Sequence, residues 1–261
     1  MALPLALLAV LAAAPPDARQ LVRESLKNWE ADAAKLAAWM FVEKDETRDL
    51  DDAGRVKSVS SKTHEVRMLE GSPYRRLLER DGKPIPPGEQ ELQEAYLKDN
   101  LERRRRETPS ERARRIAEYQ RKRDRYLAAV HEIPDAFDFQ ITGEETVAGR
   151  KAWVIDVVPH RGYRPKDRYS HVFPDVAGRV WVDQRDLRWV KLRAGLQDVA
   201  TFGWILVRIS KGGQAELEQV RLDDGTWAMR RLEYRVFVRI GLVKHIQVEE
   251  EDTYTNYQRF P

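Results

Sequence analysis

The stretch TWAMRRLEYRVFVRI, residues 226–240, alternates apolar and charged side chains over most of its length. A period of two is typical of a β-strand with one buried face and one face in water. The apolar face carries Ala228, Leu232, Tyr234, Val236 and Val238, and the other is dominated by Arg231, Glu233, Arg235 and Arg239. A sheet of such strands must curl and cover its dry face, so the covering elements decide the fold.

Strand patterns of this kind recur along the chain. Residues 39–50, 55–69 and 72–80 read as a three-strand meander, and the chain is rich in strands from Ile133 to its end. Short turns join most of them, which favours antiparallel pairing. Residues 18–37 read as an amphipathic helix, and residues 88–131, approximately, as a helical insertion. We therefore predict a mainly β, α+β fold: a bent, open antiparallel half-barrel of about ten strands wrapped over the N-terminal helix, with a long charged helical insertion.

Composition and the N-terminus indicate where the protein works. The chain of 261 residues has no cysteine, which excludes disulfides, thiol nucleophiles, zinc–thiolate sites and a lipidated N-terminal Cys. Its first residues, MALPLALLAVLAAAPP, form an apolar run too short to span a bilayer, followed by small residues. We interpret residues 1–14 as a signal peptide and residues 15–261 as one domain. The expected location is the periplasm.

The most basic segment of the chain is RRRRETPSERARRIAEYQRKRDRY, residues 103–126. Eleven Lys and Arg against four Asp and Glu give it a charge of +7, whereas the whole chain carries +3. Thr108, Pro109 and Glu111 predict a capped helix start inside it. A solvated, salt-bridged helix is one interpretation, and docking to an anionic membrane surface is another. Nucleic acid is not expected as a partner in a periplasm. The membrane-surface candidates are Arg103, Arg104, Arg105, Arg106, Arg115 and Lys122.

A local motif carries a family resemblance. In GRVWVDQRDLRWVKLRAGL, residues 178–196, Gly178, Trp181 and Asp183 fit a G-x-x-W-x-D strand that precedes a turn and a returning strand. Together with the element order, this resembles the periplasmic lipoprotein- and lipid-carrier superfamily around the outer-membrane lipoprotein-sorting proteins (LolA, LolB and LppX). The resemblance implies an apolar cavity between bent sheet and helices that holds acyl chains. The long insertion departs from the sorting protein itself, so a specific lipoprotein partner is not implied.

A half-closed barrel of this size has an interior wide enough for one amphiphile. Aromatic side chains on the predicted strands could line such a cavity. The candidate cavity-wall residues are Trp39, Phe41, Trp153, Trp181, Trp189, Trp204, Tyr234 and Phe237. Core packing is the alternative role for each of them. The long loop at 160–178 is a candidate lid, because loops of that length in a compact domain are often functional. Its candidate lid and headgroup residues are Arg161, Tyr163, Arg164, Tyr169 and Phe173.

Enzyme motifs are weak in this sequence. HEIPD, residues 131–135, begins like a metalloprotease motif, but its second histidine is missing. No catalytic residue, metal site or cofactor is predicted. The expected function is therefore binding of a lipid or an acylated protein without catalysis. An envelope scaffold or sensor with a filled core is the first alternative. An unrecognised hydrolase is the second, and clustering of Glu250, Asp252 and His245 in a concave pocket would favour it.

Overall fold

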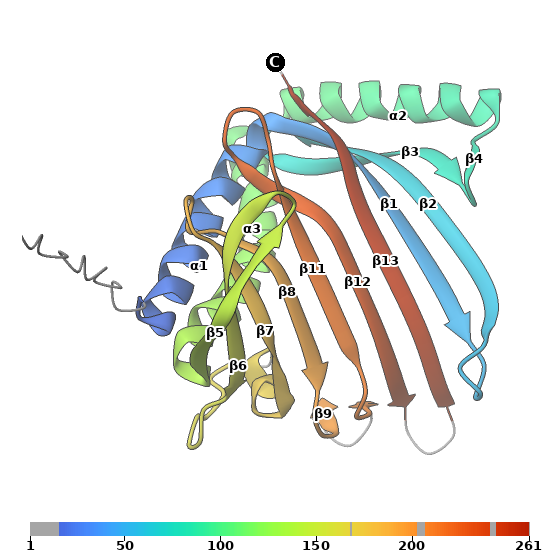
Figure 1. Cartoon of the computed structure of the whole chain (residues 1–261). Coiled ribbons are helices and arrows are strands. Elements are labelled where there is room, and N and C mark those ends of the chain that lie inside the picture. Colours follow the sequence, from blue (N-terminus) through green and yellow to red (C-terminus); the bar gives the residue numbers. More distant parts are fainter. Residues whose placement is uncertain (1–15, 168, 203–206, 241–243, 261) are drawn as a thin grey trace, which may run out of the picture.

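The computed structural model describes residues 16–167, 169–202, 207–240 and 244–260. A single antiparallel sheet runs through these ranges in the order β4-β3-β2-β1-β13-β12-β11-β8-β7-β6-β5, with β10 and β9 attached beside β12. The sheet is bent and open, because β4 and β5 end it without pairing to each other (Figure 1). The predicted half-barrel is confirmed.

The strands match the sequence patterns closely. They are β1 Trp39–Leu50, β2 Val56–Leu69, β3 Ser72–Arg80, β4 Lys83–Pro84, β5 Phe137–Val147, β6 Arg150–Pro159, β7 Val176–Asp183, β8 Trp189–Leu196, β9 Ala200–Phe202, β10 Val207–Ile209, β11 Gln214–Arg221, β12 Trp227–Ile240 and β13 Lys244–Arg259. The described part of the chain therefore has thirteen strands rather than about ten. Three of them, β4, β9 and β10, have only two or three residues. Pieces this short leave no readable period in a sequence.

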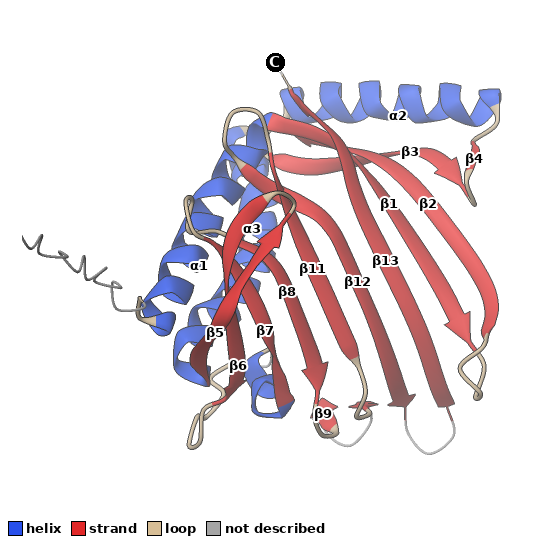
Figure 2. Cartoon of the chain, in the orientation of Figure 1, coloured by secondary structure: helices blue, strands red, loops and turns tan. Residues whose placement is uncertain are grey.

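The helices lie against one face and one edge of the sheet (Figure 2). They are α1 Ala18–Lys35, α2 Pro87–Arg106 and α3 Pro109–Ala136, with the short 3-10 helices η1 Leu36–Ala38 and η2 Ser170–Asp175. Helix α2 runs along the edge beside β3, while α1 and α3 lie close together behind β5–β8 (Figure 1). Helix α1 thus covers the sheet as the sequence predicts.

The predicted helix start within the insertion is confirmed. The hydroxyl of Thr108 accepts the backbone N–H of Glu111 at 3.3 Å, and the Glu111 carboxylate accepts the Thr108 N–H at 2.9 Å. This capping box starts α3 directly after α2. The insertion therefore consists of two helices, and α3 extends five residues beyond the predicted end at 131.

One register row shows how the inner, helix-facing side of the sheet is divided. Directly paired residues place their side chains on the same face, so a row can be followed across the strands. From β5 to β12 the row is apolar: Ile141, Ile155, Val180, Leu192, Leu217 and Leu232. On β13, β1 and β2 it continues as Asp252, Asp45 and Lys62. The inner face therefore has an apolar half and a polar half.

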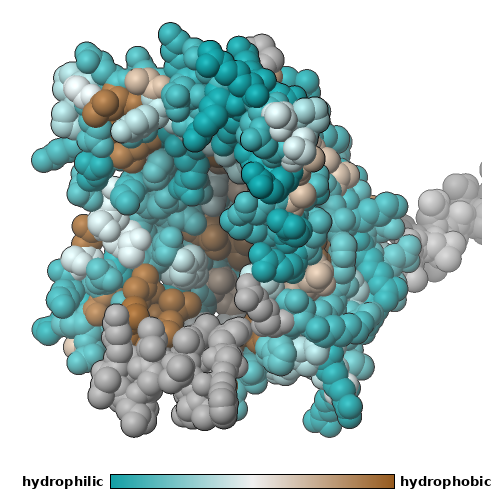
Figure 3. Space-filling model, turned by 180° about the vertical axis from the view of Figure 1, so that it is seen from behind, coloured by the Kyte–Doolittle hydropathy of each residue, from teal (hydrophilic) through white to brown (hydrophobic). Residues whose placement is uncertain are grey.

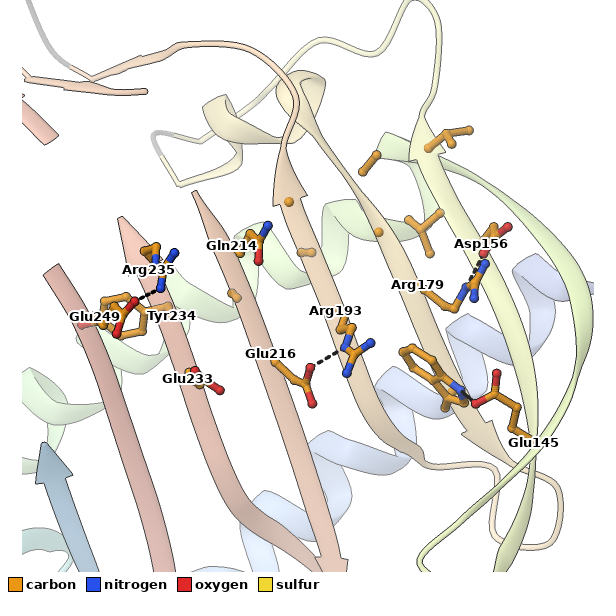
Figure 4. A pocket seen from close by; sticks show the side chains of 18 residues that line it. Glu145, Asp156, Arg179, Arg193, Gln214, Glu216, Glu233, Tyr234, Arg235 and Glu249 are labelled. Atoms are coloured by element: carbon orange, nitrogen blue, oxygen red, sulfur yellow. Dashed lines mark hydrogen bonds and ion pairs between the residues drawn. The ribbon is translucent and has the colours of Figure 1, made fainter. Parts of the chain in front are cut away.

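The outer face of the sheet is a network of ion pairs (Figure 4). Arg179 contacts Asp156 at 2.6 Å, and Arg193 and Arg235 pair with Glu216 and Glu249. A depression of about 970 Å³ lies here, lined by these same charges. Because its charged groups are paired with one another, this face is a salt-bridged surface in water.

Candidate functional site

An apolar hollow of about 310 Å³ lies between the helices and the apolar half of the inner face. Seen from behind, the molecule is hollowed and hydrophobic atoms lie at depth (Figure 3). The hollow is enclosed by α1, α3, η2 and strands β5–β8 and β11. Its principal side chains are Val22, Leu26, Trp29, Val130, Ile133, Phe139, Val157, Phe173, Trp189, Leu192 and Leu217. Its lining is almost free of polar surface, as expected of a site for a hydrocarbon chain.

Small residues leave room for the hollow. In the register row next to the one described above, β7, β8 and β11 contribute Gly178, Ala194 and Ala215. A Cβ on Gly178 would lie 2.1 Å from the backbone carbonyl oxygen of Arg193, so no larger residue fits without moving β8. Because these three positions have almost no side chains, the space above them stays open, with Val157 and Phe139 next in the row on the β5 side.

Helix α1, one wall of the hollow, is fixed by polar contacts to the turn between β7 and β8. The carboxylate of Asp32 is fully buried and accepts from Arg188 Nε at 2.7 Å. Asn28 Nδ2 donates to the carbonyl oxygen of Leu187 at 3.0 Å. Leu21 and Val22 add a buried apolar contact with the sheet. These contacts hold the wall in place although α1 has a long exposed side.

The residues of the predicted sorting-protein-like motif have structural roles in that same region. Asp183 is buried and accepts from Arg150 Nε and Nη2 at 2.7 and 2.8 Å. It also accepts the backbone N–H groups of Arg185 and Asp186, and these bonds together with Arg150 lower its pKa although burial opposes them. Asp183 therefore fixes the β7–β8 turn on which α1 is anchored.

Part of the predicted lid loop lines the hollow. The ring of Phe173, in η2, lines the hollow and lies 5.3 Å from the ring of Phe137. Tyr163 packs beside Phe173 and donates its hydroxyl to the buried carboxylate of Glu132 in α3. Burial and this bond to Glu132 raise the pKa of Tyr163 to about 12. Arg161, Arg164 and Tyr169 are exposed at the outside of the loop.

The predicted cavity-wall residues occupy several places. Trp189 lines the hollow, and Trp153 packs in the same apolar cluster. Tyr234, Phe41 and Trp39 lie outside the hollow. Tyr234 is on the inner face of β12, where it bonds to Glu250 at the border of the polar half, Phe41 packs on Tyr254 and Tyr257, and Trp39 is buried under Arg259.

The remaining wall candidates lie elsewhere. Trp181 is on the outer face, where its Nε1 donates to Glu145 at 2.9 Å. Phe237 pairs with Gln247 in an outward-facing position of β12 and lies beside Gly212. Trp204, like the predicted signal peptide, falls outside the described residues. The strand period was read correctly, but the face on which each aromatic side chain lies could not be read from aromatic character alone.

Several residues of the hollow were missing from the prediction. Leu192 and Leu217 stand in register with Leu232, so an alignment of alternating positions across the predicted strands would have found them. Trp29 and Val130 lie on the apolar faces of their helices. The sequence signal for these residues was helical and strand periodicity rather than aromatic character.

The basic run of α2 and α3 is partly structural. Arg104 donates to the carbonyl oxygens of Leu69 and Ser72 at 2.8 and 2.9 Å, and Arg115 binds Glu107 and Ser72. These two residues fasten the insertion to the β2–β3 turn. Arg103, Arg105, Arg106 and Lys122 are exposed, and three of them have long contacts with Glu70, Glu102 and Glu118.

Within the described ranges, no helix is both long and apolar enough to cross a membrane. Nor do three His, Asp or Glu residues in those ranges gather as ligands for a metal ion. Glu250 and Asp252 share the inner face of β13, while the side chain of His245 lies outside the described part of the structure.

No family model matches the chain, and no curated protein matches its sequence. Solved structures align over nearly its whole length. A putative outer-membrane lipoprotein-sorting protein domain from Vibrio parahaemolyticus aligns over 91% of this chain and 93% of its own, with 9% identity and a TM-score of 0.34. The chain's structural neighbours include the group that its sequence resembles. A LolA-superfamily protein from Nitrosomonas europaea aligns over 95% of both chains, with 9% identity and a TM-score of 0.30.

A further similar structure is a DUF1329-family protein from Desulfovibrio piger, which covers 94% of both chains at 12% identity with a TM-score of 0.31. At these identities and TM-scores, the likeness says nothing about ligand or partner. Ligand and partner must be argued from the residues of this chain.

Proposed function

We propose that this protein binds the acyl part of a lipid or of an acylated protein in its apolar hollow, without catalysis. The observation that carries the proposal is the hollow itself: about 310 Å³, lined by hydrophobic side chains of α1, α3 and five strands. Ligand pockets in proteins begin at about this size. Each methylene that leaves water for such a lining contributes about 0.8 kcal/mol.

The signal-like residues 1–14 support action in the periplasm. A carrier there would take up one acyl chain, shield it from water under η2 and α3, and release it at a membrane. The loop with Tyr163 and Phe173 lies at one end of the hollow and is the natural entrance. An envelope scaffold of the same fold is the competing function, and it needs no space in its core.

A space-filling substitution tests the proposal. Ala194 lines the hollow, so Ala194→Phe is expected to occupy it. Binding of an amphiphile with a twelve-carbon chain, followed through the fluorescence of Trp29 and Trp189, should weaken by about tenfold or more, which corresponds to ~1.4 kcal/mol. The matched control is Ala177→Phe, because Ala177 lines the outer depression.

Native mass spectrometry of the protein isolated from a periplasm adds an independent readout. Co-purified acyl species that are lost in Ala194→Phe support a carrier. Equal binding by the wild-type protein and Ala194→Phe, or no binding by either, would leave only the scaffold.

A further inference from the structure

The polar half of the inner face gathers four carboxylates on two neighbouring strands. Glu43 and Asp45 of β1 pair in register with Tyr254 and Asp252 of β13, and Glu250 of β13 pairs with Thr47. All lie on the helix-facing side, because Asp252 is paired with Leu232, which is itself paired with Leu217 of the apolar cluster. These residues form the carboxylate cluster: Glu43, Asp45, Glu250 and Asp252.

Three members of the carboxylate cluster have partners, and the fourth is left with an unused oxygen. Arg75 contacts Glu43 at 2.9 Å and Asp45 at 2.7 Å. Glu250 accepts the hydroxyl of Tyr234. Asp252 is only 9% exposed, and its Oδ1 has no hydrogen-bond partner among the described residues. A buried carboxylate oxygen without a donor is costly, so this atom marks a place where a donor or a cation would be stabilised.

Aromatic rings stand beside these carboxylates. Phe41 lies 5.3 Å from the ring of Tyr257 and 6.0 Å from that of Tyr254. Tyr254 donates its hydroxyl to Glu43. Carboxylates combined with aromatic faces are the usual means of recognising an ammonium group, through charge and cation–π attraction.

The carboxylate cluster adjoins the apolar hollow. Leu217 lines the hollow, Leu232 is its neighbour on β12, and Asp252 follows on β13. Two strand spacings of ~4.8 Å place Asp252 about 10 Å from Leu217 across the same face. One amphiphile can therefore span both halves of the inner face.

We propose that the hollow takes an amphiphile whose headgroup carries an ammonium, with the alkyl chain among Trp189, Leu192 and Leu217 and the ammonium against Asp252 and the neighbouring carboxylates. This proposal rests on the proposed acyl-binding function and adds the class of headgroup. Four carboxylates outweigh the single guanidinium of Arg75 in direct contact with them, so an anionic headgroup is disfavoured. The described residues provide no set of three metal ligands, which argues against a metal ion as the occupant.

The ionisation of Asp252 sets the pH range in which the ammonium group binds. Burial, and then the charges of Asp45, Glu250 and Glu43, raise its pKa to about 7, while Arg75 opposes the shift. His64, Lys62, Tyr234, Tyr254 and Tyr257 are further titratable groups on this part of the face. At about pH 8.5 Asp252 is mostly ionised. A quaternary ammonium keeps its charge at every pH, so it is the appropriate probe.

The experiment compares three probes with the same twelve-carbon chain below their micellar concentrations: dodecyltrimethylammonium, dodecyl maltoside and dodecyl sulfate. Calorimetric titration at about pH 8.5 should give the ammonium probe an affinity about tenfold higher than that of the maltoside, which is ~1.4 kcal/mol. The sulfate should bind more weakly than both. In Asp252→Asn the ammonium preference should disappear while maltoside binding is kept, which also shows that the variant is folded.

The matched control is Glu251→Gln. Glu251 is adjacent on β13 but points to the outer face, where it pairs with Arg231 at 2.6 Å. It should keep the full ammonium preference. Equal affinities for the three probes, tightest binding of the sulfate, or an unchanged preference in Asp252→Asn would each overturn the headgroup proposal and leave acyl binding intact. If no probe binds to the wild-type protein, the acyl-binding function itself fails.

Discussion

At the scale of single residues, Asp252 is a nearly buried carboxylate in surroundings that disfavour its charge. It is buried on a polar face beside three other carboxylates, and its neighbours disfavour its charged form. Gly178 is unusual for a steric reason, since the backbone of Arg193 occupies the space that a Cβ would need. Asp252 meets Glu43 and Asp45 only through pairing with β1, far away in the sequence, whereas Gly178 is crowded by β8, the next strand of the chain.

Asp252→Asn should stabilise the protein at neutral and higher pH. The pKa of Asp252 is about 7 in the folded chain against 3.8 ordinarily, so the folded state binds this proton more tightly. Its contribution to stability is fully present below about pH 4 and is lost as the pH rises through 7. Asp252→Asn carries a neutral amide at this position, so its stability does not fall in this pH range. Thermal unfolding at about pH 8 should show a midpoint raised by ~3 °C, and at about pH 4 no gain.

Glu251→Gln again provides the comparison for stability, because it removes a carboxylate from the same strand on the other face. The midpoint of thermal unfolding of Glu251→Gln should not rise at about pH 8. A lower midpoint for Asp252→Asn at that pH would mean that the ionised carboxylate is stabilised by a partner that this interpretation lacks.

At the scale of elements, a buried ion pair is one of the contacts that hold α1 on the sheet. Asp32 is fully buried, and Arg188 reaches it from the β7–β8 turn at 2.7 Å. That turn is itself held by Asp183 and Arg150. Arg188 therefore holds α1, and the pair of Asp183 and Arg150 holds the turn that carries Arg188.

Asp32→Asn should lower the free energy of unfolding by about 3 kcal/mol, because breaking one side of a buried pair leaves a charge without its partner. Asp135→Asn is the matched control, since Asp135 meets Arg23 at 3.5 Å with both side chains more than half exposed. It should change stability by less than ~0.5 kcal/mol. Denaturant unfolding measures both values, and similar losses for the two variants would contradict this account of how α1 is held.

In the insertion, a local sequence pattern sets the start of α3, and tertiary contacts fasten the two helices to the sheet. The capping box of Thr108 and Glu111 is local, so it was predicted correctly and is present. The role of Arg104 and Arg115 was not predictable from the run of arginines. Their guanidinium groups bind carbonyl oxygens and a hydroxyl of the β2–β3 turn, which the topology brings to them.

At the scale of the whole molecule, the protein presents an ion-paired outer face, a divided inner face and one strongly basic insertion. Four exposed cations of that insertion, Arg103, Arg105, Arg106 and Lys122, remain candidates for contact with an anionic membrane.

Liposome flotation tests this contact. Each Lys or Arg near an anionic leaflet contributes about 1 kcal/mol, so replacing all four by Gln should reduce binding to anionic vesicles by more than about tenfold. Wild-type binding should vanish with zwitterionic vesicles or at ~0.5 M salt, where charges are screened within a few ångströms. Binding that is indifferent to salt and to lipid charge would exclude docking through this patch.

The sequence by itself determined the elements: period-two strands, the first helix, the capped start of α3 and an open antiparallel sheet. These features follow from interactions over a few residues, namely alternation of side chains, turn residues and capping. The tertiary structure alone decided which aromatic rings face the hollow. Trp181 and Trp189 look alike in sequence, but the register of β7 and β8 places them on opposite faces. Likewise, only the pairing of β1, β12 and β13 brings Asp45 and Glu43 beside Asp252, because strand neighbours distant in sequence share a face only after the sheet has formed.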